Sequence, residues 1–171
     1  MKIEEFVKSF KYKVEELLDA ELILPSKQDY DYHPGDWTFL FNCAVYDLVK
    51  DYNKNYNTKI SLCVEPEAEK TPNGRGGYSD MLICSNNKKQ RYILIEHENF
   101  PKGRLKPIIN KLSKSKAIHK LIITYSFPDI SKEQIFKELK SNIQKGTSLF
   151  LLIAPWNVSS GHEYELLEIT N

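Results

Sequence analysis

The chain has 171 residues, a length that suits one domain with its own hydrophobic core, so we expect a single domain over residues 1–171. Hydrophobic residues make up 41% and charged residues 27% of the sequence, a balance that excludes a disordered chain. The formal net charge is +1, so no overall basic field indicates a nucleic-acid partner, and any such surface must be local.

Apolar stretches and cysteines favour a cytoplasmic protein without a membrane segment. The longest apolar run, near residues 148–156, is about half as long as a membrane-spanning helix. Residues 1–18 mix acids and lysines with apolar residues, unlike a signal peptide. The three cysteines, Cys43, Cys63 and Cys84, never form a CxxC pair, which is typical of buried thiols in a reducing compartment.

The first half of the chain predicts two helices and then three strands. Apolar residues at helical spacing predict a helix from about residue 3 to residue 19. Asp36 is placed to cap a second helix that closes between Asn53 and Asn57. The buried stripe of this second helix is expected to be Trp37, Leu40, Phe41, Ala44 and Leu48. Strand-like segments follow at 59–65, 78–84 and 91–98, the last two joined by a turn at 85–89.

The second half alternates helices and strands. A helix is predicted around residues 105–112, and a short apolar strand at 121–125. Ser131 and Gln134 form a capping-box pattern that begins another helix, and 148–154 is a last buried strand. No clear element is predicted between Trp156 and the end of the sequence. This order predicts an α/β fold, in which a mixed sheet with antiparallel first strands is flanked by helices.

Three acids lie where two neighbouring predicted strands meet. Asp80 lies in the second strand, and Glu96 and Glu98 end the third. Because side chains in a strand alternate, Glu96 and Glu98 share one face while His97 points to the other. Asp80 can lie across from them, and three facing carboxylates favour a hard divalent cation such as Mg²⁺ or Mn²⁺. The alternative is that these acids are the solvated face of an edge hairpin.

An acid, fifteen intervening residues and then Glu-x-acid at the end of the next strand resembles the PD-(D/E)xK nuclease superfamily. The resemblance implies a restriction-endonuclease-like fold with core order α-β-β-β-α-β, here with an extra N-terminal helix and a C-terminal helix and strand. It covers about residues 36–126. It also implies that Asp80 and Glu96 bind the metal, with the backbone carbonyl of His97 as a further ligand.

Two positions depart from that family pattern. Ser79 replaces the usual proline, which is a tolerable change. Glu98 stands where the family usually has lysine, so it would be a further ligand or a general base. The missing positive charge could come from Lys102, which follows the strand closely. The substitution is also compatible with lost catalysis.

Basic residues are concentrated directly after the motif. Residues 99–128 contain seven basic side chains and no acid, which is a strong asymmetry for a chain of net charge +1. Those expected to contact nucleic-acid phosphates are Lys102, Arg104, Lys106, Lys111 and Lys114, together with Arg75 in the preceding loop. The alternatives are an ordinary solvated helix face and a plain connecting loop. Glu65 and Glu67, at the end of the first strand, could extend the metal site.

Together these patterns predict a cytoplasmic Mg²⁺- or Mn²⁺-dependent nuclease that acts on DNA through a metal-activated water. A homodimer is expected from the resemblance alone. One alternative is a nucleic-acid-binding or regulatory protein that kept the fold and lost cleavage. Another is a nuclease directed at RNA or a nucleotide.

Overall fold

The computed structural model describes residues 2–19, 34–63, 81–97, 105–125, 131–143, 145–146, 148–154 and 164–170. The order of helices and strands along these segments is close to the one that the sequence predicts. The elements in chain order are α1 (Ile3–Asp19), α2 (Pro34–Tyr56), β1 (Ile60–Cys63), β2 (Met81–Ser85), β3 (Arg91–His97), α3 (Leu105–Lys114), β4 (His119–Tyr125), α4 (Lys132–Asn142), β5 (Ser148–Ala154) and β6 (Glu165–Thr170).

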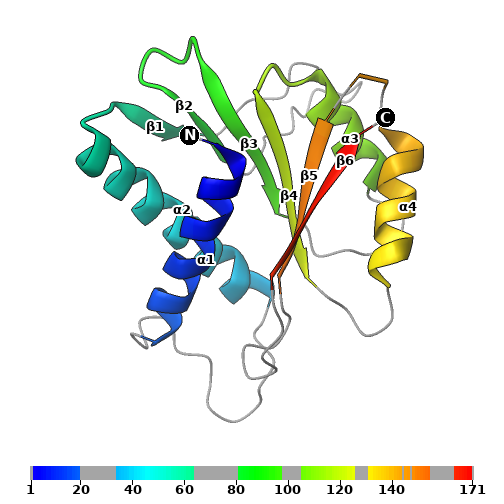
Figure 1. Cartoon of the computed structure of the whole chain (residues 1–171), viewed down its shortest axis with the longest axis horizontal. Helices are drawn as coiled ribbons and strands as arrows, with labels where there is room; N and C mark the ends of the chain where they lie inside the picture. Colours follow the sequence, from blue (N-terminus) through cyan, green and yellow to red (C-terminus); the bar gives the residue numbers. More distant parts are fainter. Residues whose placement is uncertain are drawn as a thin grey trace.

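The six described strands form one mixed sheet in the order β1-β2-β3-β4-β5-β6 (Figure 1). β1, β2 and β3 are antiparallel neighbours, β3, β4 and β5 run parallel, and β6 returns antiparallel to β5. The predicted α/β class, with antiparallel first strands and a crossover to later ones, is confirmed. β6 is an addition, because no clear element was predicted in that part of the sequence.

Helices cover both faces of the sheet, with α1 and α2 on one side and α3 and α4 on the other (Figure 1). The strands alternate accordingly. In β5, Leu152 and Ala154 pack toward α1 and α2, whereas Leu149 and Leu151 pack toward α3 and α4. Parallel central strands buried on both faces need apolar side chains on both sides, which explains the continuous apolar run of β5.

The start of α2 corrects one prediction from the sequence. Asp36 was predicted to precede this helix as its cap, but the helix begins at Pro34 and Asp36 is its third residue. Proline favours the first helical turn because its ring fixes φ and its missing N–H would have no helical partner there. At the other end, Asn57 has a φ of +49°, a left-handed conformation that asparagine tolerates after a helix.

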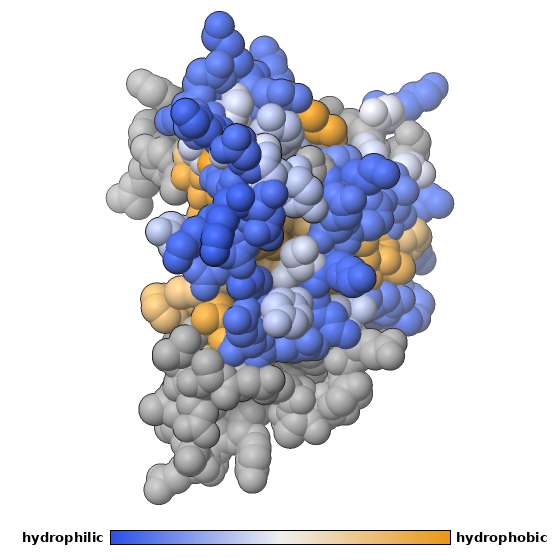
Figure 2. Space-filling model, turned by 60° about the vertical axis from the view of Figure 1, so that its left-hand side comes forward, coloured by the Kyte–Doolittle hydropathy of each residue, from blue (hydrophilic) through white to orange (hydrophobic). Residues whose placement is uncertain are grey.

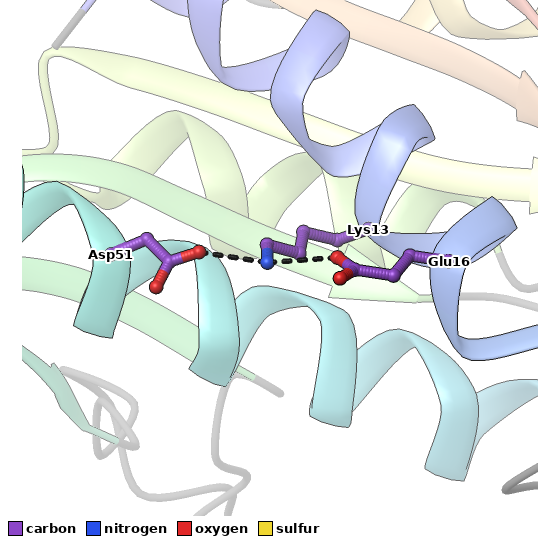
Figure 3. Close-up of polar contacts among 3 residues, drawn as sticks. All are labelled: Lys13, Glu16 and Asp51. Atoms are coloured by element: carbon purple, nitrogen blue, oxygen red, sulfur yellow. Dashed lines mark hydrogen bonds and ion pairs between the residues drawn. The ribbon is translucent and has the colours of Figure 1, made fainter. Parts of the chain in front are cut away.

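An ion-pair network joins α1 to α2 (Figure 3). The Lys13 Nζ atom lies 2.7 Å from Asp51 Oδ2 on α2 and 2.9 Å from Glu16 Oε2 on its own helix. The hydrogen bond to Asp51 raises the pKa of Lys13, and the same bond lowers the pKa of Asp51. Because both acids are well exposed, the network orients the two helices rather than dominating their stability.

Asn53 in the last turns of α2 binds the outer edge of β1. Its amide donates from Nδ2 to the carbonyl of Ile60 at 2.8 Å, and its Oδ1 accepts from the Ile60 N–H at 2.8 Å. Thr58 Oγ1 also donates to Asn53 Oδ1, at 3.1 Å. The side chain thus occupies both backbone groups of Ile60 as a neighbouring strand would, at the edge of the described sheet.

Replacing Asn53 by aspartate is expected to lower the free energy of unfolding by about 1–3 kcal/mol. The change keeps the shape but removes the donor to the Ile60 carbonyl and sets a carboxylate oxygen against it. Urea unfolding followed by far-UV circular dichroism measures the loss. The exposed Asn55, two residues along the same helix, provides the control, since Asn55→Asp should change stability by less than about 0.5 kcal/mol. Equal effects of the two substitutions would show that the contacts of Asn53 are unimportant.

The outer face formed by α1 and α2 is mostly hydrophilic, with separate apolar patches between polar side chains (Figure 2). The exposed large side chains on these two helices include Tyr12, Phe39, Tyr46 and Tyr56. Within the described segments, no helix has the length and apolar character needed to cross a membrane.

Candidate metal centre

Glu96 is a buried acid near the end of β3. It follows the buried run Ile93, Leu94 and Ile95, and only 2% of its surface is exposed. Leu94, two residues earlier, packs in the apolar cluster that includes α3 and α4, so strand alternation places Glu96 on the same face. Burying a carboxylate is costly unless a charged or hydrogen-bonding partner lies beside it, so this acid requires an explanation.

Lys111 of α3 is the described partner of that acid. Its Nζ atom lies 2.9 Å from Glu96 Oε2, and its side chain is 18% exposed. Ile108, Ile109 and Leu112 form the buried stripe of α3, and Lys111 lies at the border of this stripe. The aliphatic part of a lysine at such a border can follow the apolar surface while its ammonium reaches a buried carboxylate.

Thr124 adds a third polar side chain on the neighbouring strand. It is fully buried, and its Oγ1 has no hydrogen-bond partner among the described residues. It follows Ile122 by two residues in β4, and Ile122 is the register partner of Glu96. Alternation therefore places Thr124 on the same face as Glu96, one step further toward the strand end.

Glu96 and Thr124 are each the second-last residue of their strand, and β3 and β4 run parallel. Both side chains therefore lie toward the carboxyl ends of adjacent parallel strands. In open α/β sheets this edge is where ligands usually bind, because the loops that leave it can surround them. At this edge the carboxylate and the hydroxyl offer oxygen ligands for a cation, whereas the ammonium and the hydroxyl offer donors for a phosphate or an activated water.

His97 points away from this group, as predicted from strand alternation. Its ring packs against Phe41 of α2 with ring centroids 5.1 Å apart and an interplanar angle of 68°. Burial lowers the pKa of His97 from 6.5 to about 4, because the charged imidazolium loses hydration there. Its side chain has a packing role on the α1/α2 face, while the metal-binding role predicted for its backbone carbonyl stays a prediction.

The depressed pKa of His97 predicts that stability falls as the pH is lowered. The unfolded chain binds a proton at this residue below about pH 6.5, whereas the folded chain resists protonation down to about pH 4. Neutral His97 therefore contributes about 3 kcal/mol to the free energy of unfolding above pH 6.5, and this contribution is lost as the pH falls from about 6.5 to about 4. Urea unfolding between pH 7.5 and pH 4 should show a steeper decline for the unmodified chain than for His97→Phe. Identical pH profiles would contradict the assignment.

Most of the other predicted site residues lie outside the described residues. These are Asp80 and Glu98 of the motif, Glu65 and Glu67, and the basic residues Arg75, Lys102 and Arg104. Lys106 belongs to α3, but its side chain is not among those described. Lys114 is exposed in the last turn of α3, as a phosphate contact requires. Within the described part of the chain, no group of three or more His, Cys, Asp or Glu side chains is arranged to hold a metal ion.

The pairing of Lys111 with Glu96 differs from the role that the sequence suggested. Lys111 was predicted to contact nucleic-acid phosphates, whereas the structure places its ammonium on the buried acid. Lys102, the first candidate for a charge partner, lies outside the described residues. The position of Lys111 three residues after Ile108, beside the apolar stripe, is the signal that could have indicated an inward-reaching lysine.

No protein-family model matches the chain, and no curated protein or solved structure matches it either.

Proposed function

We propose that the chain is a metal-dependent nuclease with the restriction-endonuclease-like fold, which hydrolyses phosphodiester bonds in DNA. The observation that carries the proposal is the buried Glu96–Lys111 pair at the carboxyl end of β3. The order of elements from α2 to β4, one helix, three antiparallel strands, a helix and a parallel strand, supports it. This order is the one expected from the PD-(D/E)xK resemblance.

A hard divalent cation fits the donors at this edge of the sheet. Glu96 supplies a carboxylate, the ligand type that Mg²⁺ and Mn²⁺ prefer. Asp80, which the sequence predicts to lie across from Glu96, directly precedes Met81, and the register partner of Met81 is Ile95. When bound, the cation would polarise the phosphodiester and favour deprotonation of a water. Asp80 and Glu96 would hold it, with the His97 carbonyl and Glu98 as further ligands.

Lys111 would supply the positive charge that is lost where Glu98 replaces the usual lysine of the family. Glu98 occupies the position of the usual lysine, so the site needs a positive charge from elsewhere. The Lys111 ammonium lies 2.9 Å from the Glu96 carboxylate, so it brings a positive charge to the side chain that would bind the metal. From this position it can also donate to a phosphate oxygen of the substrate.

The same contact favours one alternative. A lysine that neutralises Glu96 can be a structural ion pair that replaces a metal, in a protein that binds nucleic acid without cutting it. Exposed Lys114 and Lys116, at the end of α3 and just after it, would contact phosphates in either case. Cleavage therefore distinguishes the two functions, whereas nucleic-acid binding does not.

The test is a cleavage assay with purified protein in Mg²⁺, in Mn²⁺ and in EDTA. Supercoiled plasmid, single-stranded DNA and single-stranded RNA serve as substrates. We expect metal-dependent cleavage of DNA that Glu96→Gln abolishes and that Glu5→Gln, at an exposed position in α1, leaves unchanged. Cleavage of RNA alone would redirect the proposal to an RNA nuclease. DNA binding without cleavage of any substrate would support the inactive binding protein.

A further inference from the structure

Two cysteine sulfurs lie in contact between β1 and β2. Cys63 Sγ and Cys84 Sγ are 3.4 Å apart, and both thiols are reduced. The two residues are diagonal neighbours, because Cys63 pairs with Leu82 and Cys84 pairs with Ser61. Both side chains pack on the face covered by α3 and α4. The sequence predicted buried thiols but contained no CxxC spacing to indicate that two of them would meet.

The two thiols are unequal in access. Cys84 is fully buried, and burial followed by the hydrogen bond with Cys63 raises its pKa to about 11. Cys63 is half-buried on β1, which has a single neighbour in the described sheet. A small oxidant therefore reaches Cys63 first, while the buried Cys84 remains a thiol until Cys63 has been oxidised. This division into an accessible and a resolving cysteine is the arrangement of redox-sensing pairs.

The geometry also permits a bond between them. A disulfide needs the sulfurs about 2 Å apart, so they must approach by about 1.4 Å. Diagonal positions on antiparallel strands have Cα atoms about 7–8 Å apart, beyond the usual range for a disulfide, so side-chain rotation must be accompanied by a backbone shift that brings the two strands closer. β1 can provide that shift, because it has four residues and lies at the edge of the described sheet.

We propose that Cys63 and Cys84 form a reversible redox pair, which hydrogen peroxide converts to a disulfide between β1 and β2. This inference goes beyond the nuclease function and does not depend on it. Disulfides in reducing compartments are usually transient and regulatory, which matches a pair that is reduced at rest and closes on oxidation.

The reaction balances in two steps. The Cys63 thiolate attacks one oxygen of the peroxide, the O–O bond breaks, and hydroxide leaves as a sulfenic acid forms on Cys63. The Cys84 sulfur then attacks the Cys63 sulfur, the S–O bond breaks, and the Cys84 proton leaves with the departing hydroxide as water. Two thiols have lost two electrons and two protons in total, and one peroxide has become two waters.

Intact-mass spectrometry of the whole folded chain tests the pair. The protein is treated with hydrogen peroxide, quenched with catalase, denatured and alkylated with N-ethylmaleimide. We expect the mass to fall by two hydrogen atoms, with one maleimide added, at Cys43, and a digest fragment linking Cys63 to Cys84. Dithiothreitol should restore three alkylation sites, the number of cysteines in the chain.

Cys43→Ser is the matched control, because Cys43 lies on α2, which covers the opposite face of the sheet. This variant should form the same cross-link, and Cys63→Ser should form none. Three maleimide additions after peroxide treatment would overturn the proposal. So would sulfinic acid accumulating on Cys63 without a cross-link, or a disulfide that involves Cys43. These outcomes are read on the unmodified chain, so they do not depend on whether a cysteine variant folds.

Discussion

Replacing Lys111 by methionine is expected to lower the free energy of unfolding by about 3–5 kcal/mol at neutral pH. Methionine keeps most of the apolar stem but removes the ammonium 2.9 Å from Glu96 Oε2. The Glu96 carboxylate is only 2% exposed, so water cannot replace the lost Lys111 ammonium without opening the packing of α3 on β3. Urea unfolding followed by far-UV circular dichroism measures the loss.

Two comparisons separate this effect from a general cost of changing a lysine. Lys116→Met, at an exposed position just after the same helix, should change stability by less than about 0.5 kcal/mol. Combining Lys111→Met with Glu96→Gln should recover much of the lost stability, because no buried charge is then left without its cation. If Lys111→Met costs less than about 1 kcal/mol, the ion pair is not the partner that Glu96 needs.

Phe41→Ala is expected to cost about 3–5 kcal/mol of unfolding free energy. Phe41 is 0% exposed, and among the described side chains it packs edge-on against two rings. Its ring centroid lies 5.1 Å from Phe10 of α1 and 5.1 Å from His97 of β3, so truncation opens a cavity where α1, α2 and the sheet meet. The loss is measured by urea unfolding at pH 7.5, where His97 is neutral in both the folded and unfolded chain.

Phe39→Ala on the same helix is the control, because Phe39 is 59% exposed and should change stability by less than about 0.5 kcal/mol. The cavity should also hydrate His97, so its pKa should rise toward 6.5 in Phe41→Ala. Nuclear magnetic resonance titration of the imidazole checks that shift. An unchanged His97 pKa in Phe41→Ala would show that Phe41 is not what buries the imidazole. Equal losses of unfolding free energy in Phe39→Ala and Phe41→Ala would show that the packing of Phe41 does not stabilise the fold.

Elements with a strong local signal could be predicted from the sequence. α1 has its apolar residues at helical spacing, and its predicted bounds match the structure. Ser131 and Gln134 form the predicted capping box at the start of α4, with both reciprocal hydrogen bonds present. β5 agrees residue by residue, because a short, continuously apolar run is the pattern of a strand buried on both faces.

Elements that depend on tertiary context could not be predicted. β6 lies at the edge of the described sheet, and Ile169 is its one fully buried side chain. Its sequence shows neither alternation nor an apolar run, so it carries no strand signal. The Glu96–Lys111 contact spans fifteen positions and depends on how α3 crosses back over the sheet. The helical and strand periodicities of the sequence do not predict a contact between residues that far apart in the chain. The contact of Cys63 with Cys84 depends in the same way on strand register, which cannot be read from two segments so far apart in the sequence.

Metal binding at Glu96 is the central claim, and isothermal calorimetry with Mn²⁺ tests it most directly. The unmodified chain and Glu5→Gln, whose change is at an exposed site, should bind Mn²⁺ alike, whereas Glu96→Gln should bind at least about tenfold more weakly. Far-UV circular dichroism must show that all three are folded. Loss of binding in Glu96→Gln alone is the predicted result. No binding by the unmodified chain, or equal affinity in all three proteins, would contradict a metal site at Glu96.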